Sequence, residues 1–115
     1  MPPADLTTPE NFKASALKSV DLDRAARRLA ALGQETRLSI YRNLIRGMPE
    51  GCSVGELQNK VGIPHSTLSF HLKKLIDVGL VTQERKGTVL TCRADFQAMD
   101  QTLGFLAREC CADGG

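Results

Sequence analysis

Residues 61–81, VGIPHSTLSFHLKKLIDVGLV, decide the fold of this 115-residue chain. A helix is predicted after Pro64, because a proline has no backbone donor and loses nothing in the first turn of a helix. Gly62 before it then belongs to a tight turn. The apolar side chains of the helix recur at a spacing that places them on one face. They are Leu68, Leu72, Leu75 and Ile76.

The other face of this helix carries short hydroxyls, imidazoles and lysines. Such side chains can enter a DNA groove and meet phosphates or base edges without steric obstruction. We therefore predict a DNA recognition helix in which Lys73 positions the protein and the hydroxyls read bases. The candidate DNA-contacting residues of the helix are His65, Ser66, Thr67, Ser69, Phe70, His71, Lys73 and Lys74.

A short helix is predicted just before the turn. Ser53 and Glu56 have the spacing of a capping box, so this helix begins at Val54, and it ends near Gly62. A short helix, a glycine turn and a helix with a polar face indicate a helix-turn-helix, with a plain helical hairpin as the alternative at this point. Two further helices are expected upstream, over residues 21–32 and 35–46.

The period of the pattern changes after Gly79. Two β-rich runs, residues 80–85 and 88–93, are joined by Lys86 and Gly87 and predict a hairpin. Beside a recognition helix this hairpin is a wing, and Arg85 and Lys86 can reach the DNA backbone or the minor groove. The predicted fold is therefore mainly α with a small β-hairpin, a winged helix-turn-helix.

A last helix is expected from Ala94 to about Cys111. It is too apolar to stand alone, which predicts that it pairs with its counterpart in a homodimer. The side chains expected to be buried along it are Phe96, Met99, Leu103 and Leu106.

Length and composition fit one small domain of 115 residues that is 42% hydrophobic. We divide the chain into residues 1–20, an extension with a possible short helix; residues 21–111, the DNA-binding and dimerisation domain; and residues 112–115, a flexible tail. The absence of a long apolar run and of a signal peptide argues against a membrane partner and for a cytoplasmic protein. Residues 60–93 hold six basic and two acidic side chains, as a duplex-binding surface would.

Three stretches together resemble one known family. ALGQETRLSIYRNL, SVGELQNKVGIPHSTLSFHLKKLIDVGLV and RADFQAMDQTLGFLARECC are similar to the ArsR/SmtB family of metal-responsive winged-helix repressors, in its arsenic-sensing branch, over about Asp21 to Cys111. The resemblance implies a homodimer with the first and last helices at its interface. It also implies two recognition helices on successive major grooves of double-stranded operator DNA with an imperfect inverted repeat, and an inducer that releases the DNA.

The sequence departs from two ligand patterns of that family. The Cys-Val-Cys box of many arsenic repressors falls here on Ser53, Val54 and Gly55, with Cys52 alone before it. The family's zinc ligands fall on Asp95, Gln97, Arg108 and Cys111. Because glutamine and arginine are not ligands in such sites, no zinc site is expected.

The adjacent thiols of Cys110 and Cys111 remain as the candidate inducer site. Soft thiolates select soft ions, so As(III) as arsenite or methylarsenite, or Sb(III), is the expected guest. Cys92 lies ~27 Å from Cys110 if the helix is continuous. It could therefore act as a third ligand only to the cysteines of a second subunit, with an antiparallel pairing of the last helices; the alternative is a small strand residue.

These patterns predict a repressor released from its operator by a trivalent arsenical. One alternative is a thiol-based redox or persulfide sensor of the same fold, which would use Cys110 and Cys111 with Cys52 or Cys92. Another is a winged-helix module that binds a protein and no DNA. An enzyme is not expected, since neither His65 nor His71 has a catalytic or metal-binding partner at a recognisable spacing.

Overall fold

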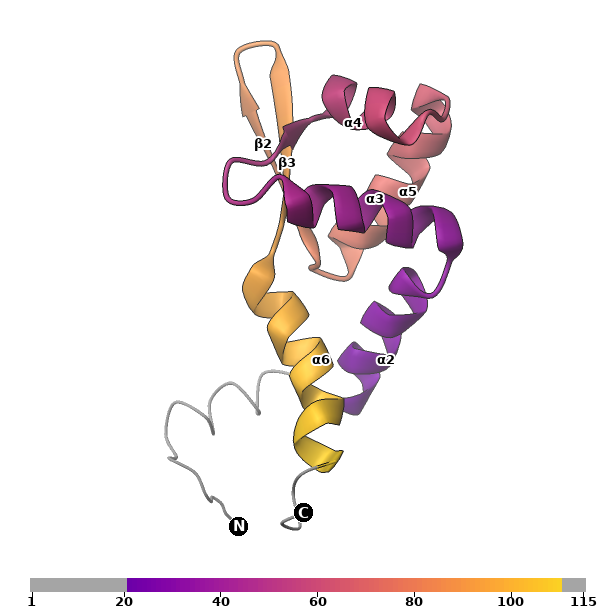
Figure 1. Cartoon of the computed structure of the whole chain (residues 1–115), viewed down its shortest axis with the longest axis vertical. Coiled ribbons are helices and arrows are strands. Elements are labelled where there is room, and N and C mark those ends of the chain that lie inside the picture. The colour runs from indigo at the N-terminus through magenta and orange to yellow at the C-terminus, as the bar shows by residue number, and fades with distance from the viewer. Residues whose placement is uncertain (1–20, 111–115) are drawn as a thin grey trace.

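The computed structural model describes residues 21–110, with the side chains of residues 109 and 110 left out of the description. Three helices and three strands form the winged helix-turn-helix body, and two further helices flank it (Figure 1). In chain order the elements are α2 (Leu22–Leu32), α3 (Glu35–Arg46), β1 (Cys52–Ser53), α4 (Val54–Val61), α5 (His65–Asp77), β2 (Val81–Lys86), β3 (Val89–Ala94) and α6 (Phe96–Cys110).

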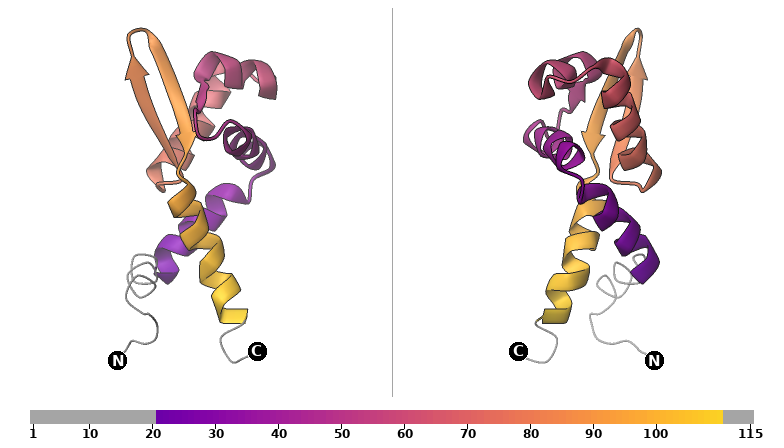
Figure 2. Two further views of the ribbon diagram at one scale, coloured as in Figure 1. Left: turned by 60° about the vertical axis from the view of Figure 1, so that its left-hand side comes forward. Right: turned by 90° about the vertical axis from the view of Figure 1, so that its right-hand side faces the viewer.

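The molecule has a body and a stalk. The body contains α3, α4, α5 and the sheet, while α2 and α6 extend away from it and cross each other at an angle (Figures 1 and 2). Helix α2 packs against α3, α5 and α6, so it connects the stalk with α5. No helix among the described residues is long and apolar enough to cross a membrane.

Local sequence signals set the start and the end of α4. The Ser53 hydroxyl accepts from the Glu56 amide at 3.1 Å, and the Glu56 carboxylate accepts from the Ser53 amide at 3.0 Å, which confirms the capping box. The helix ends at Gly62, whose φ of 72° is left-handed and favours glycine. Pro64 then stands at the N-cap of α5, one residue earlier than the first helical turn where we expected it.

The sheet is antiparallel with the strand order β1-β3-β2. The predicted hairpin is confirmed, with each strand shifted by one residue, and Lys86 pairs with Val89 across a two-residue turn. Strand β1 was not predicted. It pairs Cys52 with Cys92 and Ser53 with Thr91, so the segment before α4 becomes an edge of the sheet.

The core lies between α3, α4, α5 and the sheet. Three of the four predicted residues of the α5 stripe are buried, Leu68, Leu72 and Leu75, and Ile76 is partly buried. Phe96, Leu103 and Leu106, which we expected to be buried along the last helix as it pairs in a homodimer, are 52–54% exposed in the single chain. Leu22 on α2 and Leu38 on α3 are also exposed, at 72% and 44%. The predicted helix within residues 1–20 lies outside the described residues.

A buried arginine joins the stalk to α5. The side chain of Arg28 on α2 is only 7% exposed. Its Nε donates to the Val78 carbonyl at the end of α5 at 2.8 Å. Its NH1 group donates to the Ala98 carbonyl at 3.4 Å and to the hydroxyl of Thr102 at 3.5 Å, both on α6. Burial, and then the nearby Arg24, lower the pKa of Arg28, but a guanidinium stays charged at neutral pH.

Replacing Arg28 with methionine should therefore lower the free energy of unfolding by about 2 kcal/mol or more, because buried carbonyls lose a charged donor. Arg27→Met is the matched control on the same helix. Arg27 pairs with Asp23 at 2.9 Å, but both side chains are well exposed, and such pairs contribute under about 1 kcal/mol. Urea unfolding would measure both variants; an equal effect of the two would contradict the role given to Arg28.

Candidate nucleic-acid interface

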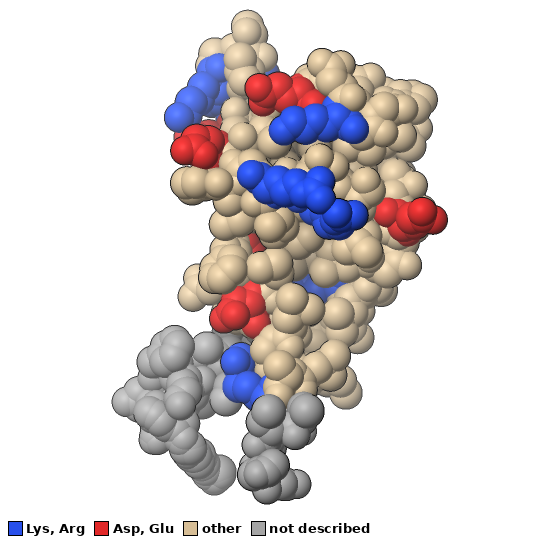
Figure 3. All heavy atoms as spheres, in the orientation of Figure 1, with Lys and Arg blue, Asp and Glu red and all other residues tan. Residues whose placement is uncertain are grey.

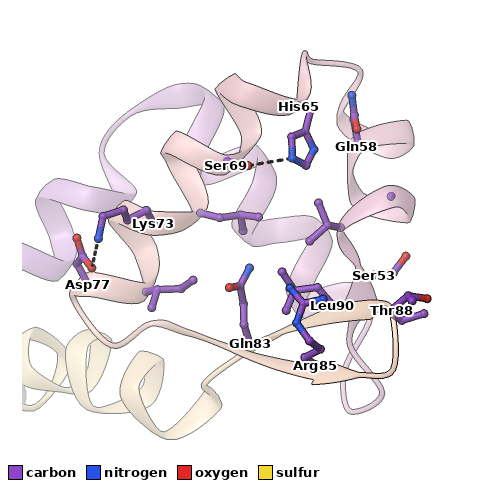
Figure 4. Close-up of a pocket in the computed structure, with 15 residues that line it drawn as sticks. Ser53, Gln58, His65, Ser69, Lys73, Asp77, Gln83, Arg85, Thr88 and Leu90 are labelled. Carbon is purple, nitrogen blue, oxygen red and sulfur yellow. Dashed lines mark hydrogen bonds and ion pairs between the residues drawn. The ribbon is translucent and has the colours of Figure 1, made fainter.

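An open groove of about 830 Å³ lies between α5 and the hairpin, with the first turn of α4 at one end. His65, Ser69 and Lys73 line it from α5, and Gln83 and Arg85 line it from β2. In Figure 4 the side chains of His65 and Gln83 point from opposite sides toward the space between helix and hairpin. The fold thus brings together, on one surface, residues of the predicted recognition helix and of the predicted wing.

Most of the predicted residues of α5 are accessible. His65, Ser66, Ser69, Phe70, Lys73 and Lys74 are exposed, and Thr67 is half-buried. Phe70 is 56% exposed. The ammonium of Lys74 lies 5.2 Å from the centre of the Phe70 ring, within cation–π distance.

The polar side chains of this face make only weak contacts with one another. Lys73 pairs with Asp77 at 3.3 Å, and the His65 ring lies 3.4 Å from the Ser69 hydroxyl. Both contacts join exposed groups one helical turn apart, where an ion pair contributes little to stability. An external partner can therefore replace these internal contacts at a small cost in free energy.

His71 differs from the rest of the predicted set, and the expectation that it contacts DNA is corrected. Its side chain is 8% exposed and turned toward the core. The Arg37 guanidinium donates to His71 Nδ1 at 3.1 Å, so Nδ1 is unprotonated and Nε2 carries the proton. Burial, and then Arg37, lower the pKa of His71. The residue supports α5 from beneath, because its position on the helix is adjacent to Leu68 and Leu75.

The hairpin carries Arg85 and Lys86 as exposed side chains on β2. Arg93 at its base pairs with Glu84 at 2.9 Å and donates to the Pro49 carbonyl at 3.2 Å. Figure 3 shows the face on which α3 lies in front, where basic side chains gather mainly in the upper half with acidic ones among them. Arg93 is thus engaged within the body, while Arg85 lines the groove.

The structure also places two of the four cysteines. Cys92 is completely buried in β3, directly opposite Cys52 of β1, which is 2% exposed. A ligand that Cys92 shared with a second subunit would require the sheet to open. The side chain of Cys110 and all of Cys111 lie outside the described residues. Sequence reasoning missed the pairing of Cys52 with Cys92, because a two-residue strand has no recognisable pattern.

The lowered pKa of His71 predicts how stability depends on pH. The folded chain favours the neutral ring of His71. The contribution of this ring to the free energy of unfolding is therefore complete above the ordinary histidine pKa of about 6.5, and it is lost as the pH falls through the pKa of His71 in the folded chain. Between pH 7.5 and pH 5, His71→Gln should therefore lose less stability than the unmodified chain. Urea unfolding at the two pH values measures the difference, and an equal loss would show that His71 is not buried as a neutral ring.

Comparison with known proteins agrees with this geometry. A helix-turn-helix domain family matches residues 32–84. The chain is 34% identical over 90 residues to the nodulation protein NolR of Rhizobium meliloti, covering 78% of this chain and 71% of NolR. It is 38% identical over 72 residues to the arsenical resistance operon repressor of Bacillus subtilis, covering 62% and 66% of the two chains.

Solved structures share the fold. One is the homodimeric winged helix-turn-helix DNA-binding domain of a possible ArsR-family regulator from Mycobacterium bovis, with a TM-score of 0.61 and 28% identity over 93% of this chain and 91% of that chain. The helix-turn-helix match, the identity to NolR over most of its length and this shared fold lead to one assignment. The chain belongs to the ArsR family of winged helix-turn-helix transcriptional regulators, which are not enzymes.

Proposed function

We propose that this protein is a cytoplasmic, homodimeric repressor that a trivalent arsenical releases from its operator. The DNA-binding part of the proposal rests on the groove between α5 and the hairpin. The arsenical part rests on the similarity to the Bacillus subtilis arsenical resistance repressor together with the adjacent thiols of Cys110 and Cys111. The similarity to NolR, a nodulation protein by name, supports the first part alone.

In this proposal α5 enters the major groove and the hairpin follows the neighbouring backbone. Lys73, Lys74, Arg85 and Lys86 then neutralise phosphates, while Ser66, Thr67, Ser69 and Phe70 face base edges. An aromatic ring fits best against an apolar base substituent, and the thymine methyl is the one that the major groove offers. Two-fold symmetry would place equivalent contacts about 34 Å apart on an inverted repeat.

The stalk offers the surface for dimerisation. Phe96, Leu103 and Leu106 follow one another along α6 at helical spacing, and each is at least 52% exposed. Leu22 of the adjacent α2 is also exposed. Exposed apolar side chains on two neighbouring helices favour association, and a second copy of the stalk is the partner proposed for them.

The inducer would bind by exchange of oxygen for sulfur. Arsenite, As(OH)₃, would react with the thiols of Cys110 and Cys111 to form two As–S bonds and release two molecules of water, with no change of oxidation state. This site lies at the end of α6, whose middle is bonded to Arg28. Because Arg28 also bonds the end of α5, a displaced α6 would shift the recognition helix relative to its dimer mate.

The DNA surface can be tested with two substitutions on one face of α5. Lys73→Gln should weaken binding to every duplex and reduce the slope of log K against log salt by about one, because one phosphate contact is lost. Ser69→Ala should keep the salt slope and change the ranking of sequences selected in vitro. A Lys73 variant with an unchanged slope and an altered sequence ranking would contradict this division of roles.

The inducer site can be tested with arsenite under reducing conditions. Arsenite should release DNA from the unmodified chain, and the double variant Cys110→Ser, Cys111→Ser should stay bound, as fluorescence anisotropy would show. Oxidant and persulfide, applied in parallel without arsenite, are the controls. Release by these agents but not by arsenite would contradict the proposal and favour a thiol-based redox or persulfide sensor.

A further inference from the structure

Two cysteines far apart in the sequence form a pair within the sheet. Cys52 of β1 and Cys92 of β3 are direct partners in the antiparallel register, so their side chains lie on the same face. Both are free thiols, with exposed fractions of 2% and 0%. Each sulfur has a polar neighbour, Lys60 at 3.9 Å from Cys52 and Gln83 at 3.3 Å from Cys92.

The spacing of such a pair favours a bridging atom over a direct disulfide. Residues directly opposite in antiparallel strands have Cβ atoms about 4.5–5.5 Å apart. A disulfide requires about 3.5–4.5 Å, so it would pull the two strands together. A single atom bonded to both sulfurs lengthens the link and fits the wider spacing.

We propose that Cys52 and Cys92 form a dithiol site for a trivalent arsenical that carries one carbon substituent. The reaction exchanges oxygen for sulfur: RAs(OH)₂ and two thiols give RAs(SR′)₂ and two molecules of water. Two As–O and two S–H bonds break, two As–S bonds form, and each thiol proton leaves in water. Neither arsenic nor sulfur changes oxidation state, so no oxidant is required.

The surroundings of the pair select against inorganic arsenite. Among the described side chains no group of three or more potential metal ligands is found, so a third thiolate is not available there. Arsenite held by two thiols would keep a buried hydroxyl group, whereas the polar neighbours of the pair, Lys60 and Gln83, already contact the two sulfurs. Burying a hydroxyl without a partner of its own is unfavourable. An organic substituent is apolar, and the bridged product is neutral. Burial also raises the pKa of Cys92, which disfavours a free thiolate.

Access to the pair is through the edge of the sheet. Strand β1 has two residues and is paired on one side, so its local opening disrupts few hydrogen bonds. The Cys52 sulfur lies against Gly47, where an added Cβ would be 2.8 Å from it. The glycine therefore leaves room for this thiol between α3 and the sheet.

A bridge between the thiols would disturb the DNA surface directly. Cys52, Cys92 and Gln83 stand in one row across the three strands, and Gln83 lines the groove that faces α5. Ser53, next to Cys52, caps α4, the first helix of the helix-turn-helix. An added substituent would thus displace Gln83 and the start of α4, without passing through the stalk; this consequence rests on the proposed function as a repressor.

The experiment uses the full chain with Cys110→Ser and Cys111→Ser, and phenylarsine oxide as the probe. Native mass spectrometry should show one phenylarsine bridge per chain, and DNA affinity should fall at least tenfold. Arsenite should give neither effect in this variant. Adding Cys52→Ala or Cys92→Ala should abolish the bridge, with circular dichroism and DNA binding as checks on folding. If either alanine variant does not fold, peptide mapping of the bridged parent locates the same two residues.

No adduct on the folded parent variant would overturn the inference, and so would an adduct that persists in Cys52→Ala. A disulfide between Cys52 and Cys92 without a phenylarsine adduct would overturn it as well. The result is independent of the site at Cys110 and Cys111. If arsenite fails to release the unmodified chain from DNA, the inducer site at Cys110 and Cys111 is wrong, but the bridge between Cys52 and Cys92 is not affected. If phenylarsine oxide does not bridge Cys52 and Cys92, the inducer site at Cys110 and Cys111 is not affected.

Discussion

The buried guanidinium of Arg28 is the contact on which the arrangement of the molecule depends. It comes from α2, donates to the carbonyl that ends α5, and donates to Ala98 and Thr102 in the first half of α6. A charge enclosed in this way must keep its acceptors, because an unpaired buried charge is strongly destabilising. One side chain of α2 therefore links the end of α5 with α6.

The second constraint is the division of α5 into two faces. Leu68, Leu72 and Leu75 fix its orientation against the core, which leaves Phe70 and Lys73 accessible. A side chain can therefore be assigned to packing or to recognition by its angle on the helix. His71 shows why residue type alone is insufficient, since an imidazole can serve either role and here it is buried.

Much of the fold was predictable because its signals are local. The apolar repeat of α5, the capping box at Ser53 and Glu56, and the change of period after Gly79 each depend on neighbouring residues. Strand β1 was not predictable, because it exists only through its pairing with β3. The pattern of α6 also did not tell which of its apolar side chains, such as Phe96, the same chain covers and which it leaves exposed.

The residues of the candidate site likewise divide into those that local sequence pattern predicts and those that only the structure reveals. The exposed residues of α5 and the hairpin were found from local pattern, whereas the partnership of Cys52 with Cys92 spans forty positions and comes from strand register. Sequence reasoning grouped the cysteines by proximity in the chain and so emphasised Cys110 and Cys111. The structure adds a pair of different chemistry, which is enclosed, has one polar neighbour at each sulfur and, among the described residues, is limited to two thiols.

In this account, thiols at two places act on one DNA surface. Ligands at the end of α6 would act through the stalk and Arg28, and ligands between β1 and β3 would act through Gln83 and the start of α4. The two routes differ in the arsenical they admit, because only the buried pair excludes a residual hydroxyl group. Both routes require that the groove between α5 and the hairpin be the surface that holds DNA.

Hydrogen exchange measured with and without a duplex selected in vitro tests that requirement most directly. The account predicts that DNA slows exchange in residues 65–74 and 83–90, while the exposed face of α3 is unchanged. Protection confined to α2 and α6, with α5 and the hairpin unaffected, would contradict it.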